Sequence, residues 1–144
     1  MSSAAVLVAC LGFAASAAAA PSQQPVNLVA TPAVKAALRT SFLAAHKQYQ
    51  PAKVKGPLKG DTYYGRYGAF EYALSVFDVP LTGTTDQPEL FRRPVGGGWV
   101  DRGDTGGEVC AGWVPLPLIK LWGFVQTSYS VVKGKRVYCY APGP

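Results

Sequence analysis

The chain contains 144 residues, of which 49% are hydrophobic and 15% are charged, and its formal net charge is +6. This length suits one domain with one hydrophobic core, and this hydrophobic content excludes an intrinsically disordered protein. The positive charge bears on solubility and on association with partners, and it does not decide the fold.

The N-terminus has the layout of a secretory signal peptide. An apolar run from Ala4 to Phe13 is too short to span a bilayer, which needs about 20 residues. Small side chains at Ala17 and Ala19 suit the positions that signal peptidase reads, and Pro21 excludes cleavage directly before itself. We therefore predict that residues 1–19 are a signal peptide and that the mature protein is secreted.

Export separates the three cysteines into two groups. Leu7-Val8-Ala9-Cys10 resembles a lipobox, which gives an alternative localisation in which a lipid on Cys10 anchors the protein. Cys110 and Cys139 remain after cleavage, and in an oxidising compartment we predict that they form a disulfide. Two cysteines and a single histidine fall short of a four-ligand zinc site, so no metal and no cofactor are expected.

An amphipathic helix is predicted over residues 32–49, after a flexible leader at residues 20–30. Thr31 provides a hydroxyl cap, and Pro32 occupies the first helical position. Pro51 ends the helix. Apolar side chains at helical spacing form one stripe along it (Val34, Leu38, Phe42, Ala45 and Tyr49).

Two hairpins are predicted after a basic linker at residues 50–61. The strands are residues 62–67 and 69–79 in the first hairpin, and residues 89–95 and 99–102 in the second. Small side chains such as Ala73 lie on one face of the 69–79 strand, where a helix can pack closely. Gly68 and the Gly96–Gly98 run supply the turns.

A short helix over residues 115–122 and a last hairpin of residues 128–132 and 135–140 complete the prediction. Together the elements indicate one α+β domain at residues 31–144. We expect an antiparallel sheet of about four to six strands, with an N-terminal amphipathic helix and a short second helix.

Charged residues are distributed unevenly along the chain. Residues 35–59 carry six positive charges and no acid, whereas residues 61–108 carry all eight acids against four arginines. Residues 110–144 carry four positive charges and no acid. We favour an interpretation in which basic segments fold against the acidic middle. The alternative is an exposed basic face for an anionic cell-envelope polymer or another protein; export argues against a nucleic acid.

The second hairpin holds the candidate binding residues. Aromatic side chains in sheets usually belong to a core, as we expect for Tyr72 and Trp122. An exposed aromatic side chain beside arginines can instead stack on a sugar ring or anchor a protein. We therefore select Trp99 as an exposed anchor, with arginines around it (Arg92, Arg93 and Arg102).

Catalytic signals are weak. Asp104-Thr105-Gly106 matches an aspartic protease string, but turn chemistry explains it equally well, and no second copy occurs in the chain. Glutamates can work in pairs in glycosidases, which makes Glu71, Glu89 and Glu108 candidates. His46 lies on the polar side of the predicted helix with no carboxylate nearby in sequence, and we expect a solvated surface histidine.

One block of the sequence has a familiar pattern. It begins with Tyr63-Tyr64-Gly65-Arg66-Tyr67-Gly68 and continues through Gly83-Thr84-Thr85-Asp86-Gln87-Pro88-Glu89-Leu90-Phe91 to Gly103-Asp104-Thr105-Gly106-Gly107. Over about residues 35–123 the chain resembles a group of small secreted proteins from high-GC Gram-positive bacteria. That group has no known activity, so the resemblance implies export and assigns no catalytic residue.

Two classes of function remain open. The first is a non-catalytic secreted or envelope-associated binding protein that uses the second hairpin. The second is a small secreted hydrolase built on Asp104 with Glu71 or Glu108. We favour the first, because the sequence contains no recognisable combination of nucleophile, base and orienting group.

Overall fold

The computed structural model describes residues 23–80, 83–84 and 87–143. The predicted signal peptide, its cleavage position and the alternative lipid anchor at Cys10 lie outside these residues. Within the described ranges, no helix is both long enough and apolar enough to cross a membrane.

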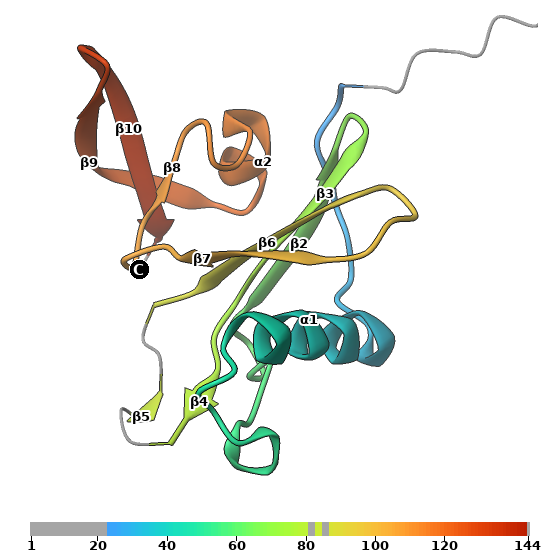
Figure 1. Cartoon of the computed structure of the whole chain (residues 1–144). Coiled ribbons are helices and arrows are strands. Elements are labelled where there is room, and N and C mark those ends of the chain that lie inside the picture. The colour runs from blue at the N-terminus through green and yellow to red at the C-terminus, as the bar shows by residue number, and fades with distance from the viewer. Residues whose placement is uncertain (1–22, 81–82, 85–86, 144) are drawn as a thin grey trace, which may run out of the picture.

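An antiparallel sheet with the strand order β1-β2-β3-β6-β7 forms the centre of the molecule (Figure 1). Its strands are β1 (Val26–Asn27), β2 (Thr62–Tyr67), β3 (Phe70–Ser75), β6 (Glu89–Pro94) and β7 (Val100–Asp104). Tyr67 pairs with Phe70, so β2 and β3 are joined by a two-residue turn. Gly68 in that turn has a φ of 57°, which favours glycine. Both predicted hairpins of this sheet are confirmed.

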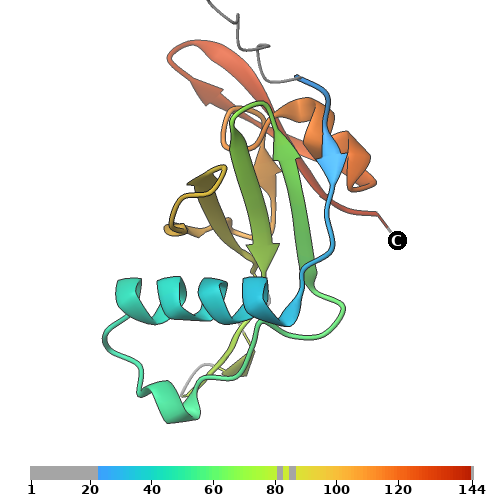
Figure 2. The same ribbon diagram turned by 90° about the vertical axis from the view of Figure 1, so that its right-hand side faces the viewer.

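Helix α1 (Pro32–Ala45) covers one face of the sheet and runs across the strands (Figure 2). Thr31 Oγ1 accepts a hydrogen bond from Val34 N, as the predicted cap requires. Leu38 and Phe42 are fully buried and pack against a core that includes Ala73. The small side chain on β3 lets the helix lie close, in agreement with the sequence prediction.

The opposite face of the sheet is covered by a second layer. This layer contains α2 (Leu116–Leu121) and a three-stranded sheet of β8 (Val109–Cys110), β10 (Lys135–Pro142) and β9 (Phe124–Val132). Leu118, Ile119 and Trp122 are buried there against Tyr72 and Leu74 of β3. The central sheet therefore has a separate hydrophobic core on each side, and the chain forms one α+β domain.

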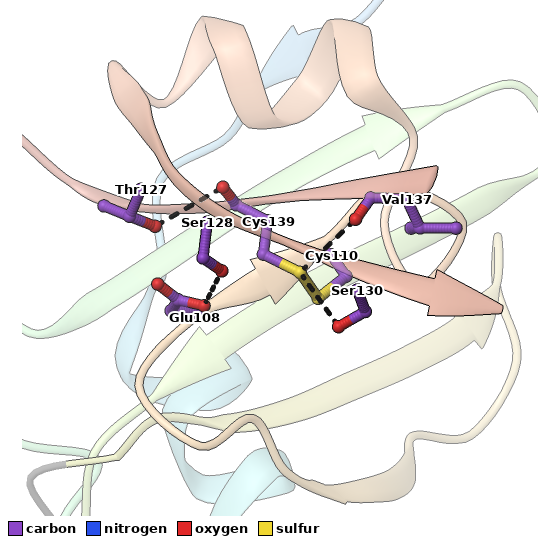
Figure 3. The surroundings of a disulfide bond; sticks show 7 residues. All are labelled: Glu108, Cys110, Thr127, Ser128, Ser130, Val137 and Cys139. Carbon is purple, nitrogen blue, oxygen red and sulfur yellow. Dashed lines mark hydrogen bonds between the residues drawn. A yellow bond between two sulfur atoms is a disulfide. The ribbon is translucent and has the colours of Figure 1, made fainter. Parts of the chain in front are cut away.

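The predicted disulfide between Cys110 and Cys139 is confirmed. These residues are direct partners in the β8–β10 ladder, and their sulfur atoms are bonded (Figure 3). The bridge joins positions 29 residues apart. It fastens the short strand β8 to the C-terminal hairpin.

Some segments differ from their predicted forms. Val26 and Asn27 of the predicted leader pair with β2 as an edge strand. The 69–79 strand is interrupted, and β4 (Asp78–Val79) pairs instead with β5 (Gly83–Thr84). The interruption arises because the backbone of Val76 bonds with the preceding loop, at Leu58 N and Asp61 O. A short 3-10 helix occupies Pro51–Lys53, and the last hairpin is longer than predicted.

Helix α1 is also shorter than predicted, since it ends at Ala45 and not at residue 49. His46 leaves the helical conformation, with φ −111° and ψ 64°. Its backbone N–H still donates to Phe42 O, so the last turn is capped. The early end allows the His46 side chain to reach the sheet.

We expect the disulfide to contribute about 3–4 kcal/mol, because it restricts the unfolded chain across a loop of this length. A variant that combines Cys110→Ala with Cys139→Ala should lose this amount of unfolding free energy in urea denaturation. A loss below about 1 kcal/mol would show that removal of the bridge adds little conformational entropy to the unfolded chain.

Gly65 of β2 should not tolerate a side chain. A Cβ atom at this position would lie 2.6 Å from Leu118 Cδ1 and 2.8 Å from the carbonyl oxygen of Val26. We expect Gly65→Ala to reduce the free energy of unfolding by about 1–3 kcal/mol through overpacking. Gly98→Ala is the matched control, since nothing lies within 4 Å of a Cβ there. Equal stability of the two variants would contradict the close packing of α2 on β2.

Candidate functional site

The four predicted binding residues do not form one site. Successive side chains of β6 point to opposite faces of the sheet, so Arg92 and Arg93 stack on different aromatic rings. Both nevertheless line a shallow pocket of about 270 Å³ with Arg102, and Trp99 is not part of its wall. Arg92 lies over the rings of Phe70 and Tyr72, on the α2 side. Arg93 lies over Trp99, on the α1 side.

On the α1 side, Arg93 and Trp99 make several contacts with the rest of the protein. Arg93 Nε donates a 2.7 Å hydrogen bond to Glu71, and its guanidinium carbon is 4.4 Å from the centre of the Trp99 ring. Trp99 is half-buried and also packs edge-on against Tyr64. Its carbonyl oxygen accepts a hydrogen bond from Ser41 of α1. The structure therefore places Trp99 against the α1 core, and not in the exposed position that we expected.

The α2 side brings together Arg92, Arg102 and a different tryptophan. They line a cavity of about 250 Å³ whose wall also includes Leu90 and Asp104. Trp113, in the loop between β8 and α2, is 50% exposed. The sequence analysis did not select Trp113 as a binding residue. Only the packing of this loop against the β6–β7 hairpin places it beside the arginines.

The charges of this cavity are incompletely balanced. In the part of the chain that the structure describes, neither Arg92 nor Arg102 forms an ion pair with a carboxylate. The guanidinium carbon of Arg92 lies 3.7 Å from the centre of the Phe70 ring, and its buried Nε has no hydrogen-bond acceptor among the described residues. The contact with Phe70 holds the guanidinium of Arg92 without neutralising its charge.

Asp104 is the acid in the cavity wall. Its Oδ1 accepts a 2.5 Å hydrogen bond from the backbone N–H of Gly106. This is the behaviour of an aspartate in a turn, which is the simpler of the two explanations given for the Asp104-Thr105-Gly106 string. The side-chain amide of Gln87 also donates to this carboxylate, 2.9 Å from each of its two oxygens, so a ligand would have to share Asp104 with Gln87.

The other predicted catalytic carboxylates lie elsewhere. Glu71 is buried on the α1 side and accepts hydrogen bonds from Tyr64, Arg66 and Arg93. Glu108 lies near the disulfide and accepts a hydrogen bond from Ser128 (Figure 3). Neither Glu71 nor Glu108 lines the cavity whose wall contains Asp104.

The environment of Glu71 is that of a structural ion pair. Burial by itself raises the pKa of Glu71, but the hydrogen bonds from Arg66, Tyr64 and Arg93 outweigh burial and hold that pKa below its usual range. The carboxylate is charged at neutral pH and is satisfied on both oxygens. It lacks the raised pKa that a general acid needs.

A second cluster, which the sequence analysis did not anticipate, joins His46, Glu89 and Asp101. His46 Nε2 lies 3.5 Å from Glu89 Oε1 and 3.4 Å from Asp101 Oδ2. The side chains of Glu89 and Asp101 are only 4% and 3% exposed, whereas that of His46 is 25% exposed. The expectation of a solvated His46 without a carboxylate was wrong, because the end of α1 lies over β6 and β7.

Burial and mutual interaction shift the pKa values of the two acids in this cluster. Burial, and then the charges of Asp101 and Asp104, raise the pKa of Glu89 to about 8. Burial also raises the pKa of Asp101, although the amide of Gly103 and the imidazole of His46 act in the opposite direction. One nitrogen donor and two carboxylates within 4.8 Å of one another are a set that can hold a metal ion.

Comparison of the chain with protein-family models, with curated proteins and with solved structures finds no match.

The Glu71 ion pairs predict a specific pH dependence. Because its pKa is lowered on folding, the charged form contributes stability above the ordinary carboxyl pKa of 4.5, and this contribution is lost as the pH falls through the folded value. Glu71→Gln should therefore cost about 1–3 kcal/mol at pH 7, and less at pH 3, in urea denaturation. Asp61→Asn alters an exposed carboxylate and should change stability by less than about 0.5 kcal/mol. An unchanged cost of Glu71→Gln between the two pH values would refute this assignment.

Proposed function

We propose that this protein is an exported, non-catalytic binding protein that takes an anionic carbohydrate polymer of the cell envelope in the Arg92–Arg102–Trp113 cavity. The signal-peptide pattern supports export, and the disulfide fits an oxidising compartment. The resemblance to small secreted proteins of high-GC Gram-positive bacteria points in the same direction.

One observation carries the proposal. Two guanidinium groups without a carboxylate partner among the described residues line the same cavity as a half-exposed tryptophan. Guanidinium groups bind carboxylate and phosphate with paired hydrogen bonds, and an exposed indole can stack on a sugar ring. Asp104 in the cavity wall can accept hydrogen bonds from sugar hydroxyls. These groups together suit a sugar that bears a negative charge.

The alternative function, a small secreted hydrolase, has less support. The carboxylates proposed for it are bonded to different groups: Asp104 to the amide of Gly106, Glu71 to Tyr64, and Glu108 to Ser128. Glu71 is committed to ion pairs with Arg66 and Arg93. A binding protein needs none of these residues to react.

The cavity can be tested with a defined acidic polysaccharide. Purified protein should bind polygalacturonate, and not the neutral polymer dextran, in isothermal titration calorimetry. Arg102→Gln should weaken this binding about tenfold or more, because a hydrogen bond to a charged group contributes about 1.5–3 kcal/mol. Trp113→Ala should weaken this binding as well, because it removes the ring that can stack on a sugar. Both side chains are exposed, so we expect both variants to fold.

Arg136→Gln is the matched control for charge. Arg136 is an exposed arginine that lies over Tyr129 of the β9–β10 hairpin, so this variant removes the same charge at another place. We expect it to change the affinity for polygalacturonate by less than about threefold, because salt screens the attraction between the polymer and a charge far from the cavity. If Arg136→Gln and Arg102→Gln weakened binding equally, net charge would be responsible and the cavity would not be the site.

A further inference from the structure

The His46–Glu89–Asp101 cluster lies on the opposite face of the sheet from the cavity and has no part in the proposed function. Its three side chains come from distant parts of the chain: the C-terminal end of α1, the first residue of β6 and the second residue of β7. Each presents a donor atom to the same point, and these atoms lie within 4.8 Å of one another. The arrangement is thus a product of the fold and not of a local motif.

The spacing of the donor atoms suits a small divalent ion. A tetrahedral zinc site with bonds of about 2.0–2.1 Å places neighbouring donor atoms about 3.3–3.4 Å apart. The distances from His46 Nε2 to Asp101 Oδ2 and to Glu89 Oε1 are 3.4 and 3.5 Å. Two carboxylates also match the charge of a divalent cation, which would otherwise cost much to bury.

Two buried carboxylate oxygens of the cluster have no hydrogen-bond partner among the described residues. Glu89 Oε2 is shielded from solvent, and no hydrogen-bond donor among the described residues reaches it. The same is true of Asp101 Oδ2, which faces His46 without hydrogen-bond geometry. Buried carboxylate oxygens normally have partners, and leaving one unsatisfied costs about 1–3 kcal/mol or more. Asp101 Oδ2 is thus both without a hydrogen bond and 3.4 Å from His46 Nε2, while Glu89 has one oxygen near His46 and a second without a partner. A cation bound among the three side chains would supply the missing partner.

The side chains are also held in position before a metal arrives. The His46 ring stacks on Phe42, with ring centres 4.3 Å apart, so the imidazole is oriented by the helix that carries it. Asp101 Oδ1 accepts a 2.8 Å hydrogen bond from the backbone N–H of Gly103, which turns Oδ2 toward the cluster. Contacts of this kind around the ligands fix ligand orientation in metal sites.

We infer that His46, Glu89 and Asp101 form a binding site for a divalent first-row transition metal ion, of which Zn²⁺ is the representative. Imidazole nitrogen favours such ions over Ca²⁺ and Mg²⁺, which prefer oxygen ligands in larger number. The partly exposed His46 provides access from solvent, while the two acids form the buried base of the site. Three protein ligands leave room for water to complete the coordination.

A bound ion would link three segments that pack together only in the folded protein. Because the unfolded chain does not hold these ligands together, binding should stabilise the fold.

The single histidine makes a direct test possible. Protein prepared without a polyhistidine tag is titrated with Zn²⁺ in metal-free buffer, and the imidazole resonances of His46 are followed by NMR. We expect one equivalent to bind, with a shift of these resonances and a rise in the thermal midpoint. Ca²⁺ and Mg²⁺ at the same concentration should produce neither. Unchanged His46 resonances up to about 1 mM Zn²⁺ would overturn the proposal without recourse to any variant.

Conservative variants assign the ligands. Glu89→Gln, Asp101→Asn and His46→Gln should each weaken Zn²⁺ binding about tenfold or more, as loss of even an outer partner commonly costs this much. Glu108→Gln changes a carboxylate near the disulfide and should bind Zn²⁺ as the unaltered protein does. Circular dichroism without metal establishes that each variant is folded. Zn²⁺ affinity that is the same in the three cluster variants and in the control would contradict the assignment.

Binding of polygalacturonate provides the distinction between this site and the cavity. His46→Gln should leave polygalacturonate affinity unchanged, because His46 lies at the end of α1 and does not line the cavity. If the unaltered protein bound Zn²⁺ but did not bind polygalacturonate, the proposed function alone would be rejected. The reverse result would reject the metal site alone.

Discussion

The alternation of side chains along β6 is the constraint on which the rest of the structure depends. Glu89, Phe91 and Arg93 face α1, whereas Leu90 and Arg92 face α2. One strand therefore supplies an acid to a buried cluster on one side and a cation to an open cavity on the other. The backbone between them keeps the acid and the guanidinium apart, so they do not pair with each other.

Irregularities in the neighbouring elements complete the acidic cluster. Glu89 pairs with Asp104 and Phe91 with Asp101, so the β6–β7 ladder contains a shift of register, and Gly103 beside it has a φ of 95°. The shift leaves the Gly103 N–H free to bond Asp101 Oδ1. The early end of α1 then places His46 above both acids. A regular ladder or a longer helix would disperse these three side chains.

The disulfide has a corresponding role on the α2 side. Cys110 accepts a 3.0 Å backbone hydrogen bond from Trp113, so the bridge holds the start of the loop that carries the exposed indole. The same bridge fastens β8 to β10, whose Tyr140 belongs to the core beneath α2. The cavity wall thus depends on the covalent link as well as on hydrophobic packing.

Local sequence patterns determined the elements and several pairings of this protein. The Thr31-Pro32 start of α1, the turn at Gly68 and the Cys110–Cys139 bridge follow from capping, from backbone conformation and from the count of cysteines. Only the tertiary structure decided the sites, because they depend on which faces of separate elements meet. Period-two alternation gave Arg92 and Arg93 different aromatic partners, and loop packing brought Trp113 to Arg102. The placement of the α1 terminus joined His46 to two acids more than forty residues away.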